Sequence, residues 1–277
     1  MIELGRYNVL KVKKKTRVGL FLSDSDDNEI LLPNKYIPED NCALGDDIRV
    51  FCYLDNEERP VATTLQPYVS KDDFGFLRVA EVNEVGAFLD WGLEKNLLVP
   101  FREQRSPMKA GHWYVVFCYL DPKSSRLVAS NRLDRFLDNS EIQLVAGDEV
   151  KLLITRNTDL GWETVVNGRH KGLIYKDDIF QELSTGDKLL GYIRKVRKDN
   201  KLDITLQPLG HLKLEPSAQL VLDRLLDNDG VLNLHDKSDP QEIKDKLQMS
   251  KKTFKKAIGI LYKARKIVIK EDGIYKV

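Results

Sequence analysis

The pentapeptide Phe-Cys-Tyr-Leu-Asp occupies residues 51–55 and recurs unchanged at residues 117–121. Two further phrases recur around it, Val-Gly-x-Phe-Leu at 18–22 and 85–89, and Leu-x-Pro at 31–33 and 98–100. Because three phrases return in one order at nearly one spacing, this part of the chain contains two copies of a single module.

A third copy of the module follows and is more divergent. Gly161, Trp162 and Glu163 stand where the Gly-x-Phe phrase stood, and residues 172–175 replace the Leu-x-Pro phrase. A Gly-Asp pair at 186–187 then opens a long apolar run, as Gly45 and Asp46 do in the first copy. The sequence therefore predicts three modules in tandem.

Each module has the pattern of a small β-barrel. Runs such as residues 48–54 and 115–120 are rich in β-branched and aromatic residues and are bounded by Gly, Asp, Asn and Pro. Five short strands in about 65 residues are typical of a closed barrel of the OB type. A module this small buries little apolar surface alone, so we expect neighbouring modules to dock.

The pattern changes after Pro208. Residues 210–216 indicate a linker, and apolar residues then recur at helical spacing. In the helix expected over residues 217–226, the predicted core stripe consists of Leu220, Val221, Leu225 and Leu226.

Two more helices and a hairpin complete the C-terminal region. Ser238, Asp239 and Pro240 supply a cap and a first-turn proline for a helix that ends at Leu247. Ser250 caps a third helix, whose apolar face consists of Phe254, Ala257, Ile258 and Leu261. Residues 267–270 and 274–277 flank Asp272-Gly273, which favours a hairpin with a type I′ turn. These elements predict a winged helix-turn-helix.

The expected protein is thus multidomain and mainly β. Three tandem OB-fold barrels of five strands span residues 1–67, 68–135 and 144–209, and an α+β winged-helix domain spans 214–277.

Composition places the chain among soluble intracellular proteins. Its 277 residues are 42% hydrophobic and 31% charged, which excludes a wholly disordered chain. No apolar stretch approaches the roughly 18 residues of a membrane-spanning helix, and the N-terminus lacks a secretory signal. We expect a cytoplasmic protein without a membrane partner.

Catalysis has little support in the sequence. The four histidines lie far apart, and none has acidic or cysteine neighbours at metal-ligand spacing: His112, His170, His211 and His235. Motifs for hydrolases, metalloproteases and nucleotide-binding loops are absent. We therefore expect no catalytic residues, no metal and no cofactor.

The three cysteines, Cys42, Cys52 and Cys118, suggest neither a disulfide framework nor a zinc site, because their number is odd and no CxxC spacing occurs. Cys52 and Cys118 are expected to be small buried strand residues.

Strand parity singles out two phenylalanines. Alternation places Ala87, Leu89 and Trp91 in the core and leaves Phe88 and Asp90 outside. In the first copy, Leu20 and Leu22 point inward, leaving Phe21 and Ser23 outside. An exposed aromatic at one position of two modules suits base stacking. The alternative is that both rings pack under a loop or against the next module.

These phrases resemble a known RNA-binding module. The order Val-Gly-x-Phe-Leu, then Leu-x-Pro or Gly-Leu-Ile-Tyr, then Gly-Asp opening a long strand, is similar to the S1-type domain of ribosomal proteins and ribonucleases. Three such copies and a winged helix resemble the bacterial conserved virulence factor B family, a group of RNA-binding regulators.

The resemblance implies specific contact residues. Phe21 and Phe88 match the stacking aromatic of the S1 domain, and Tyr175 matches its usual histidine on the next strand. Basic residues just before the final strand, where phosphate is often bound, are Arg59, Arg126 and Lys201.

No copy carries the complete set. Pro33 and Pro100 replace the histidine in the first two copies, and Glu163 replaces the phenylalanine in the third. Each module would then bind weakly, with affinity arising from several linked modules.

Two basic clusters add to these positions. The third module carries Arg194, Lys195, Arg197, Lys198 and Lys201, which suit a phosphate backbone or, alternatively, form a solvated face. Lysines share a face of the third helix of the winged-helix domain: Lys251, Lys252, Lys255 and Lys256. Lysines act as point charges, so this helix is expected to bind backbone and read little sequence.

The sequence therefore predicts a non-catalytic protein that binds single-stranded RNA, and the resemblance implies a regulator of RNA stability or translation. The alternative is a DNA-binding transcription regulator that uses the winged helix, with barrels that dock proteins. A nuclease is a third hypothesis, weakened by the absence of a carboxylate or histidine constellation.

Overall fold

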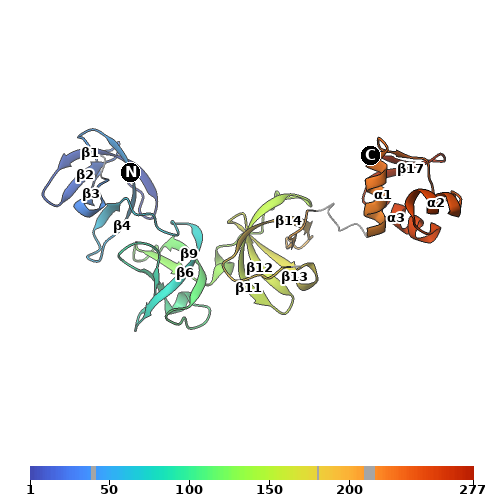
Figure 1. Cartoon of the computed structure of the whole chain (residues 1–277). Coiled ribbons are helices and arrows are strands. Elements are labelled where there is room, and N and C mark those ends of the chain that lie inside the picture. The colour runs from blue at the N-terminus through green and yellow to red at the C-terminus, as the bar shows by residue number, and fades with distance from the viewer. Residues whose placement is uncertain (39–41, 180, 209–215) are drawn as a thin grey trace. The chain divides into compact units, whose positions relative to one another are not determined.

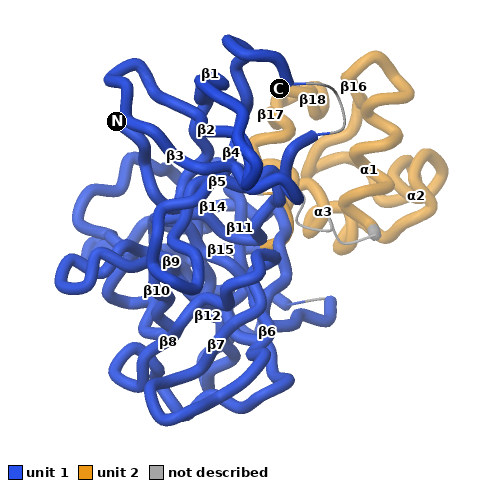
Figure 2. The backbone as a smooth tube through the Cα atoms, turned by 90° about the vertical axis from the view of Figure 1, so that its left-hand side faces the viewer, with its two compact units in different colours: residues 1–205 blue, residues 206–277 orange. Residues whose placement is uncertain are grey.

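The computed structural model describes residues 1–38, 42–179, 181–208 and 216–277. The chain forms two compact units, residues 1–205 and residues 206–277 (Figure 2). The first unit contains three closed five-stranded barrels and the second a helical domain with a small sheet (Figure 1). The predicted multidomain, mainly β fold is confirmed. The linker predicted at 210–216 lies outside the described residues, apart from Pro216.

The first barrel (barrel 1) contains β1 (Tyr7–Lys15), β2 (Gly19–Ser23), β3 (Glu29–Pro33), β4 (Asp47–Leu54) and β5 (Pro60–Thr63). Its strands are ordered β1-β2-β3-β5-β4, with a parallel contact between β3 and β5 and antiparallel contacts elsewhere. A 3-10 turn, η1 (Asn34–Tyr36), follows β3.

Barrels 2 and 3 repeat this topology. Barrel 2 contains β6 (Asp73–Val82), β7 (Gly86–Asp90), β8 (Leu97–Pro100), β9 (Trp113–Leu120) and β10 (Leu127–Ser130). Barrel 3 contains β11 (Glu149–Thr158), β12 (Gly161–Val166), β13 (His170–Tyr175), β14 (Lys188–Val196) and β15 (Leu202–Thr205). Three more 3-10 turns of the same length are η2 (Phe101–Glu103), η3 (Leu133–Arg135) and η4 (Lys176–Asp178).

The glycine that opens the second strand of each barrel is required by a close backbone approach. A Cβ on Gly19, Gly86 or Gly161 would lie between 2.0 and 2.3 Å from a carbonyl oxygen of the neighbouring strand. Their φ angles are +155°, +155° and +145°, which side-chain-bearing residues rarely adopt. This explains why glycine recurs in the phrase that defines the module.

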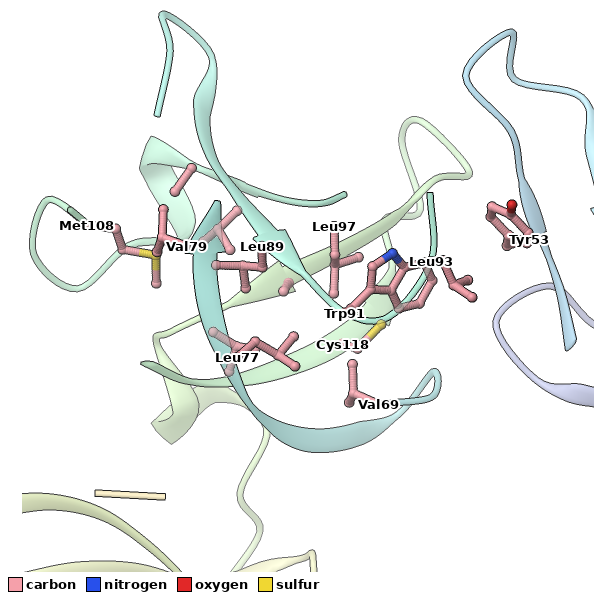
Figure 3. Packing of buried hydrophobic residues seen from close by; sticks show 14 of the residues in the cluster. Tyr53, Val69, Leu77, Val79, Leu89, Trp91, Leu93, Leu97, Met108 and Cys118 are labelled. Atoms are coloured by element: carbon pink, nitrogen blue, oxygen red, sulfur yellow. The ribbon is translucent and has the colours of Figure 1, made fainter. Parts of the chain in front are cut away.

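The Phe-Cys-Tyr phrase packs in a different hydrophobic cluster on each side of its strand. Cys52 on β4 lies in the core of barrel 1, whereas Phe51 and Tyr53 pack with the core of barrel 2 around Trp91. The Phe51 and Trp91 rings meet edge to face at 5.8 Å, and Tyr53 and Trp91 at 6.4 Å. Figure 3 shows Tyr53 reaching from its own strand toward Trp91 and Leu93. Barrels 1 and 2 therefore share a hydrophobic cluster, as the docking expectation requires.

The second copy of the phrase behaves in the same way. Cys118 belongs to the barrel 2 cluster, while Phe117 packs with Leu153 and Val165 of barrel 3. Phe117 also stacks on Phe136 with ring centroids 4.3 Å apart. The prediction that Cys52 and Cys118 are buried strand residues is confirmed, and burial raises the pKa of both thiols to about 12.

The second unit is a winged helix. It contains α1 (Pro216–Asp227), β16 (Val231–Leu232), α2 (Pro240–Leu247), α3 (Lys251–Lys263), β17 (Ile267–Ile269) and β18 (Ile274–Lys276), with sheet order β16-β18-β17. Asp239 caps α2 by accepting from the Gln241 amide at 2.8 Å, and Ser250 caps α3 by accepting from the Thr253 amide at 3.1 Å. The four predicted core residues of α3 are all buried.

Two expectations for this domain were wrong in part. Val221 and Leu225 are buried on α1, but Leu220 and Leu226 are 41% and 48% exposed, because the buried stripe instead includes Ala218. Ala218 precedes Val221 by three residues and Leu225 by seven, which is the spacing of one helix face.

The predicted hairpin is present, but its turn is not type I′. Neither Asp272 nor Gly273 has the positive φ that this turn requires. Glycine is needed at 273 for space instead, because a Cβ there would lie 2.4 Å from the carbonyl oxygen of Leu232 on β16.

Candidate nucleic-acid interface

One position on the second strand of each barrel is equivalent in space. Phe21 pairs with Lys14 and Leu31, Phe88 with Glu81 and Leu98, and Glu163 with Arg156 and Leu173. In each barrel the partner on the first strand follows a β-bulge, which changes the register there. The three side chains therefore occupy the same place on the outer face, with different neighbours.

In barrel 1 this position combines an aromatic ring with a cation. Leu20 and Leu22 are buried, as predicted, and Phe21 is half-buried on the outer face. The Lys14 ammonium lies 4.5 Å from the centre of the Phe21 ring and 3.2 Å from a Glu29 carboxylate oxygen. Ser23, expected to be outside, is buried. The Phe21 face offers both a π-surface for a base and a charge for a phosphate.

In barrel 2 the parity prediction is confirmed at every position. Ala87, Leu89 and Trp91 are buried, Phe88 is half-buried, and Asp90 is exposed. Phe88 lines a groove of about 320 Å³ together with residues of barrel 1, including Tyr53 and Leu54. The ring therefore lies beside barrel 1, the preceding module, and also borders a groove, so base stacking by Phe88 stays a prediction.

In barrel 3 the same position is an ion-pair centre. The Glu163 carboxylate accepts from the Arg156 guanidinium at 2.7 Å and lies 3.1 Å from the Lys171 ammonium. Lys171 also pairs with Asp134 at 2.6 Å. Burial lowers the pKa of Lys171 and hydrogen bonds to Asp134 and Glu163 raise it, with a raised pKa as the net result. This surface carries paired charges where barrels 1 and 2 have a phenylalanine ring.

Tyr175 lies at the end of β13, half-buried beside a groove of about 610 Å³. Its hydroxyl accepts a short hydrogen bond from the Arg197 guanidinium, whose carbon lies 5.6 Å from the ring centre. Arg197 also pairs with Asp203 at 2.8 Å, and this hydrogen bond raises the pKa of Arg197. Lys201 lines the same groove, so three predicted residues are brought together there.

Much of the basic run in barrel 3 is neutralised by acidic side chains within and around the run. Arg194 pairs with Asp178 on η4, Arg197 pairs with Asp203 on β15, and Lys201 pairs with Asp199 at 2.8 Å. Lys195 and Lys198 are exposed and have no ion pair with any described residue. The run is thus less positive than the sequence suggests.

Arg59 and Arg126 lie immediately before β5 and β10, as expected, and both are ion-paired. Arg59 contacts Asp55 and Glu57, each at 2.7 Å, and the hydrogen bond to Asp55 raises the pKa of Arg59. Arg126 donates to Glu58 of barrel 1 at 2.6 Å. A phosphate would have to compete with these carboxylates.

Three of the four predicted lysines of α3 have exposed side chains. Lys252 and Lys255 are exposed and have no ion pair within the described part of the chain. Lys256 is also exposed, and the Lys251 ammonium donates to the Lys237 carbonyl at 3.2 Å. Because Phe254, Ala257 and Ile258 anchor the opposite side of α3 in the core, this lysine face points outward.

Sequence reasoning missed a second aromatic surface. Trp113 at the start of β9 is 53% exposed, and the centre of its ring lies 5.2 Å from that of Phe76 on β6. It borders a cavity of about 290 Å³ that Arg105 and Arg156 also line. In the sequence, Trp113 is an aromatic residue that follows polar residues at the start of a strand, which could have indicated exposure. Only the fold shows that it lies beside residues of barrel 3.

No cluster of three or more potential metal ligands occurs among the described residues. Among the helices described, none is long and apolar enough to cross a membrane.

Two parts of the chain match known domain families. Residues 4–65 match the S1 domain family, and residues 219–275 match the CvfB-like winged helix domain family. The chain is 28% identical to the uncharacterized protein YitL of Bacillus subtilis, over 97% of this chain and 92% of that protein. It is also 28% identical to conserved virulence factor B of Staphylococcus epidermidis, over 85% of this chain and 81% of that protein.

A solved structure from Streptococcus pneumoniae, described as a multidomain protein with nucleic acid binding domains, is 26% identical and covers 99% of this chain and 98% of its own, with a TM-score of 0.46. The resemblance of the chain to the conserved virulence factor B proteins is confirmed over most of its length. The matched domains support binding of nucleic acid.

Proposed function

We propose that this chain, which resembles conserved virulence factor B over most of its length, is a non-catalytic cytoplasmic protein that binds single-stranded RNA and regulates gene expression after transcription. Its S1-like barrels would stack unpaired bases, and the lysines of α3 would neutralise phosphates. The observation that carries the proposal is the Phe21 ring on the open outer face of barrel 1, with the Lys14 ammonium 4.5 Å away.

This pair of side chains favours single-stranded RNA for a physical reason. A ring can stack only on a base whose face is accessible, and the bases of a duplex already stack on one another. The adjacent ammonium can contact the phosphate that links successive bases, and each such contact on a single strand releases about 0.7 counterion.

The test is a titration of the full chain with unstructured RNA, duplex RNA and duplex DNA at several salt concentrations. Unstructured RNA should bind most tightly, and its affinity should fall steeply with salt. Tightest binding to duplex DNA would instead support the transcription regulator that uses its winged helix.

Variants at one position separate stacking from general hydrophobicity. Phe21→Leu retains apolar volume but has no π-face, so affinity for unstructured RNA should fall by about 1–3 kcal/mol. Phe21→Trp retains the π-face and should restore binding. If Leu and Trp variants bind alike, Phe21 does not stack on a base.

The lysine face of α3 has a control in the same domain. Lys252→Gln with Lys255→Gln should weaken binding to many RNA sequences by a similar factor and reduce the salt dependence. Lys244→Gln with Lys246→Gln changes the net charge equally on α2 and should have a smaller effect. Equal losses in the two pairs would show that only net charge matters.

A further inference from the structure

The turn between β4 and β5 of barrel 1 lines a groove together with Phe88 of barrel 2. Glu58 in this turn accepts a hydrogen bond from Arg126 at 2.6 Å, and the Lys95 ammonium donates to the carbonyl oxygen of Asp55 at 2.7 Å. Lys35 of η1 also pairs with Glu94 of barrel 2. Two polar contacts thus hold the turn against barrel 2, and the third joins η1 to barrel 2.

These contacts enclose one side of the groove of about 320 Å³, a volume within the range of ligand pockets. Phe88, Leu98 and Val85 give it an apolar wall, and Arg126 and Lys95 supply positive charge. Asn96 also lines it, and its side-chain amide has no hydrogen-bond partner among the described residues. A π-face, a guanidinium and an unpaired amide are the groups that a stacked base, a phosphate and a base edge would each contact.

We propose that this groove between barrels 1 and 2 binds one nucleotide of single-stranded RNA. The Glu58 carboxylate competes with the phosphate of that nucleotide for Arg126. The base would lie on Phe88, with Asn96 at its edge. The proposal rests on the function proposed above and adds to it a site that neither barrel has alone.

The Glu58–Arg126 pair is suited to being exchanged. The two side chains are 46% and 50% exposed, and ion pairs with such exposure contribute little to folding stability. A phosphate also offers the guanidinium two oxygens and a negative charge, so it can replace the carboxylate without leaving Arg126 unpaired.

The backbone also holds Glu58 at this place. Glu58 has a φ of +64°, and the corresponding turn residues of barrels 2 and 3, Ser125 and Asn200, have similar values of +53° and +56°. Asparagine tolerates this left-handed conformation better than most residues, whereas glutamate has no such preference. The turn geometry is therefore common to the three barrels, and the carboxylate that contacts the next barrel is particular to the first.

The experiment compares two neighbouring acids of the same turn. Glu58→Gln removes the competing charge and should raise affinity for an unstructured RNA by about two- to fivefold. Glu57→Gln changes the net charge equally, but Glu57 pairs with Arg59 and does not line the groove, so its effect should be smaller. Equal effects of the two variants would overturn the proposal.

A double-mutant cycle assigns the gain to Arg126. In an Arg126→Gln background, Glu58→Gln should no longer increase affinity, because the phosphate contact that it releases is gone. A gain that persists in this background would refute the exchange. Ultraviolet crosslinking of the wild-type complex, followed by peptide mapping, should identify the strand that carries Phe88, and crosslinks confined to other barrels would count against the groove.

The outcomes separate this proposal from the broader one. If the wild-type chain does not bind unstructured RNA, both fail. If it binds and Phe21→Leu weakens binding, but Glu58→Gln and Glu57→Gln change the RNA affinity equally, the proposed function stands. The proposed competition of Glu58 with phosphate in the groove is then refuted. Melting curves of the Glu58 and Glu57 variants should coincide with that of the wild type, which ensures that affinities refer to folded protein.

Discussion

Replacing Gly86 by alanine should strongly destabilise the barrel unit. A Cβ at this position would lie 2.3 Å from the Val99 carbonyl oxygen and 3.0 Å from the Cα of Pro100. Gly86 pairs directly with Pro100 in the β7–β8 ladder, so this carbonyl cannot retreat without opening the barrel. The added methyl group must therefore displace strand backbone, not a flexible side chain.

The magnitude follows from two costs. Overpacking a tight site costs about 1–3 kcal/mol, and a side chain in this glycine-favoured backbone region costs a similar amount. We expect Gly86→Ala to lower the free energy of unfolding by roughly 2–6 kcal/mol. Gly19→Ala and Gly161→Ala should act alike, because their Cβ atoms would lie 2.1 and 2.0 Å from carbonyl oxygens.

Gly259 in α3 provides the control of opposite sign. A Cβ there would have no atom within 4 Å, and its φ is not positive. Gly259→Ala should therefore stabilise the winged helix by about 0.5–1 kcal/mol, the helix-interior difference between these residues.

Calorimetry of the full chain can follow both changes, because they affect different compact units. A Gly86→Ala variant within about 0.5 kcal/mol of the wild type, the usual scale of neutral surface changes, would refute the close approach. A destabilising Gly259→Ala would show that the exposed face of α3 is covered.

Leu89→Ala should cost about 2–5 kcal/mol as a buried leucine, whereas Phe88→Ala should cost much less, and equal losses in urea titrations would place Phe88 in the core. Asp239→Ala should destabilise the winged helix by about 0.5–2 kcal/mol through loss of the α2 cap, and an unchanged melting transition of that unit would contradict this. Cys52 and Cys118 should resist iodoacetamide at pH 8 until urea unfolds the chain. Burial raises the pKa of both thiols to about 12, above the usual value near 9, so the reactive thiolate is scarcer in the folded state. Rapid labelling of both thiols in the native protein would refute their burial.

The architecture was largely predictable because it depends on local patterns. The repeated phrases gave the number of barrels, strand parity placed Leu89 inside and Phe88 outside, and Ser250 marked the start of α3. Each of these inferences needs only residues that are close in sequence. Parity failed at Ser23, at the end of β2, where the surrounding chain buries a residue that alternation places outside.

The candidate site was less predictable because its electrostatics depend on distant pairs. Arg126 meets Glu58, 68 residues earlier, and Arg194 meets Asp178, 16 residues earlier. Lys14 lies over Phe21 only because a bulge shifts the register of β1. A count of local charge cannot reveal these partners, so it overestimated how many cations are unpaired.

The outward aromatics of the Phe-Cys-Tyr phrase give the series of barrels a direction. In each phrase the cysteine packs in the core of its own barrel, and the aromatic residues pack against the following barrel. The fourth strand therefore connects each barrel to the one that follows it in the chain. In barrel 3 the corresponding residues are Tyr192, Ile193 and Arg194, and the arginine is exposed and paired with Asp178. Barrel 3 therefore has a charged residue where barrel 1 has an aromatic residue that packs on the following barrel. The fourth strand thus distinguishes the third barrel from the other two, and exchanging the order of the barrels would remove the contacts between them.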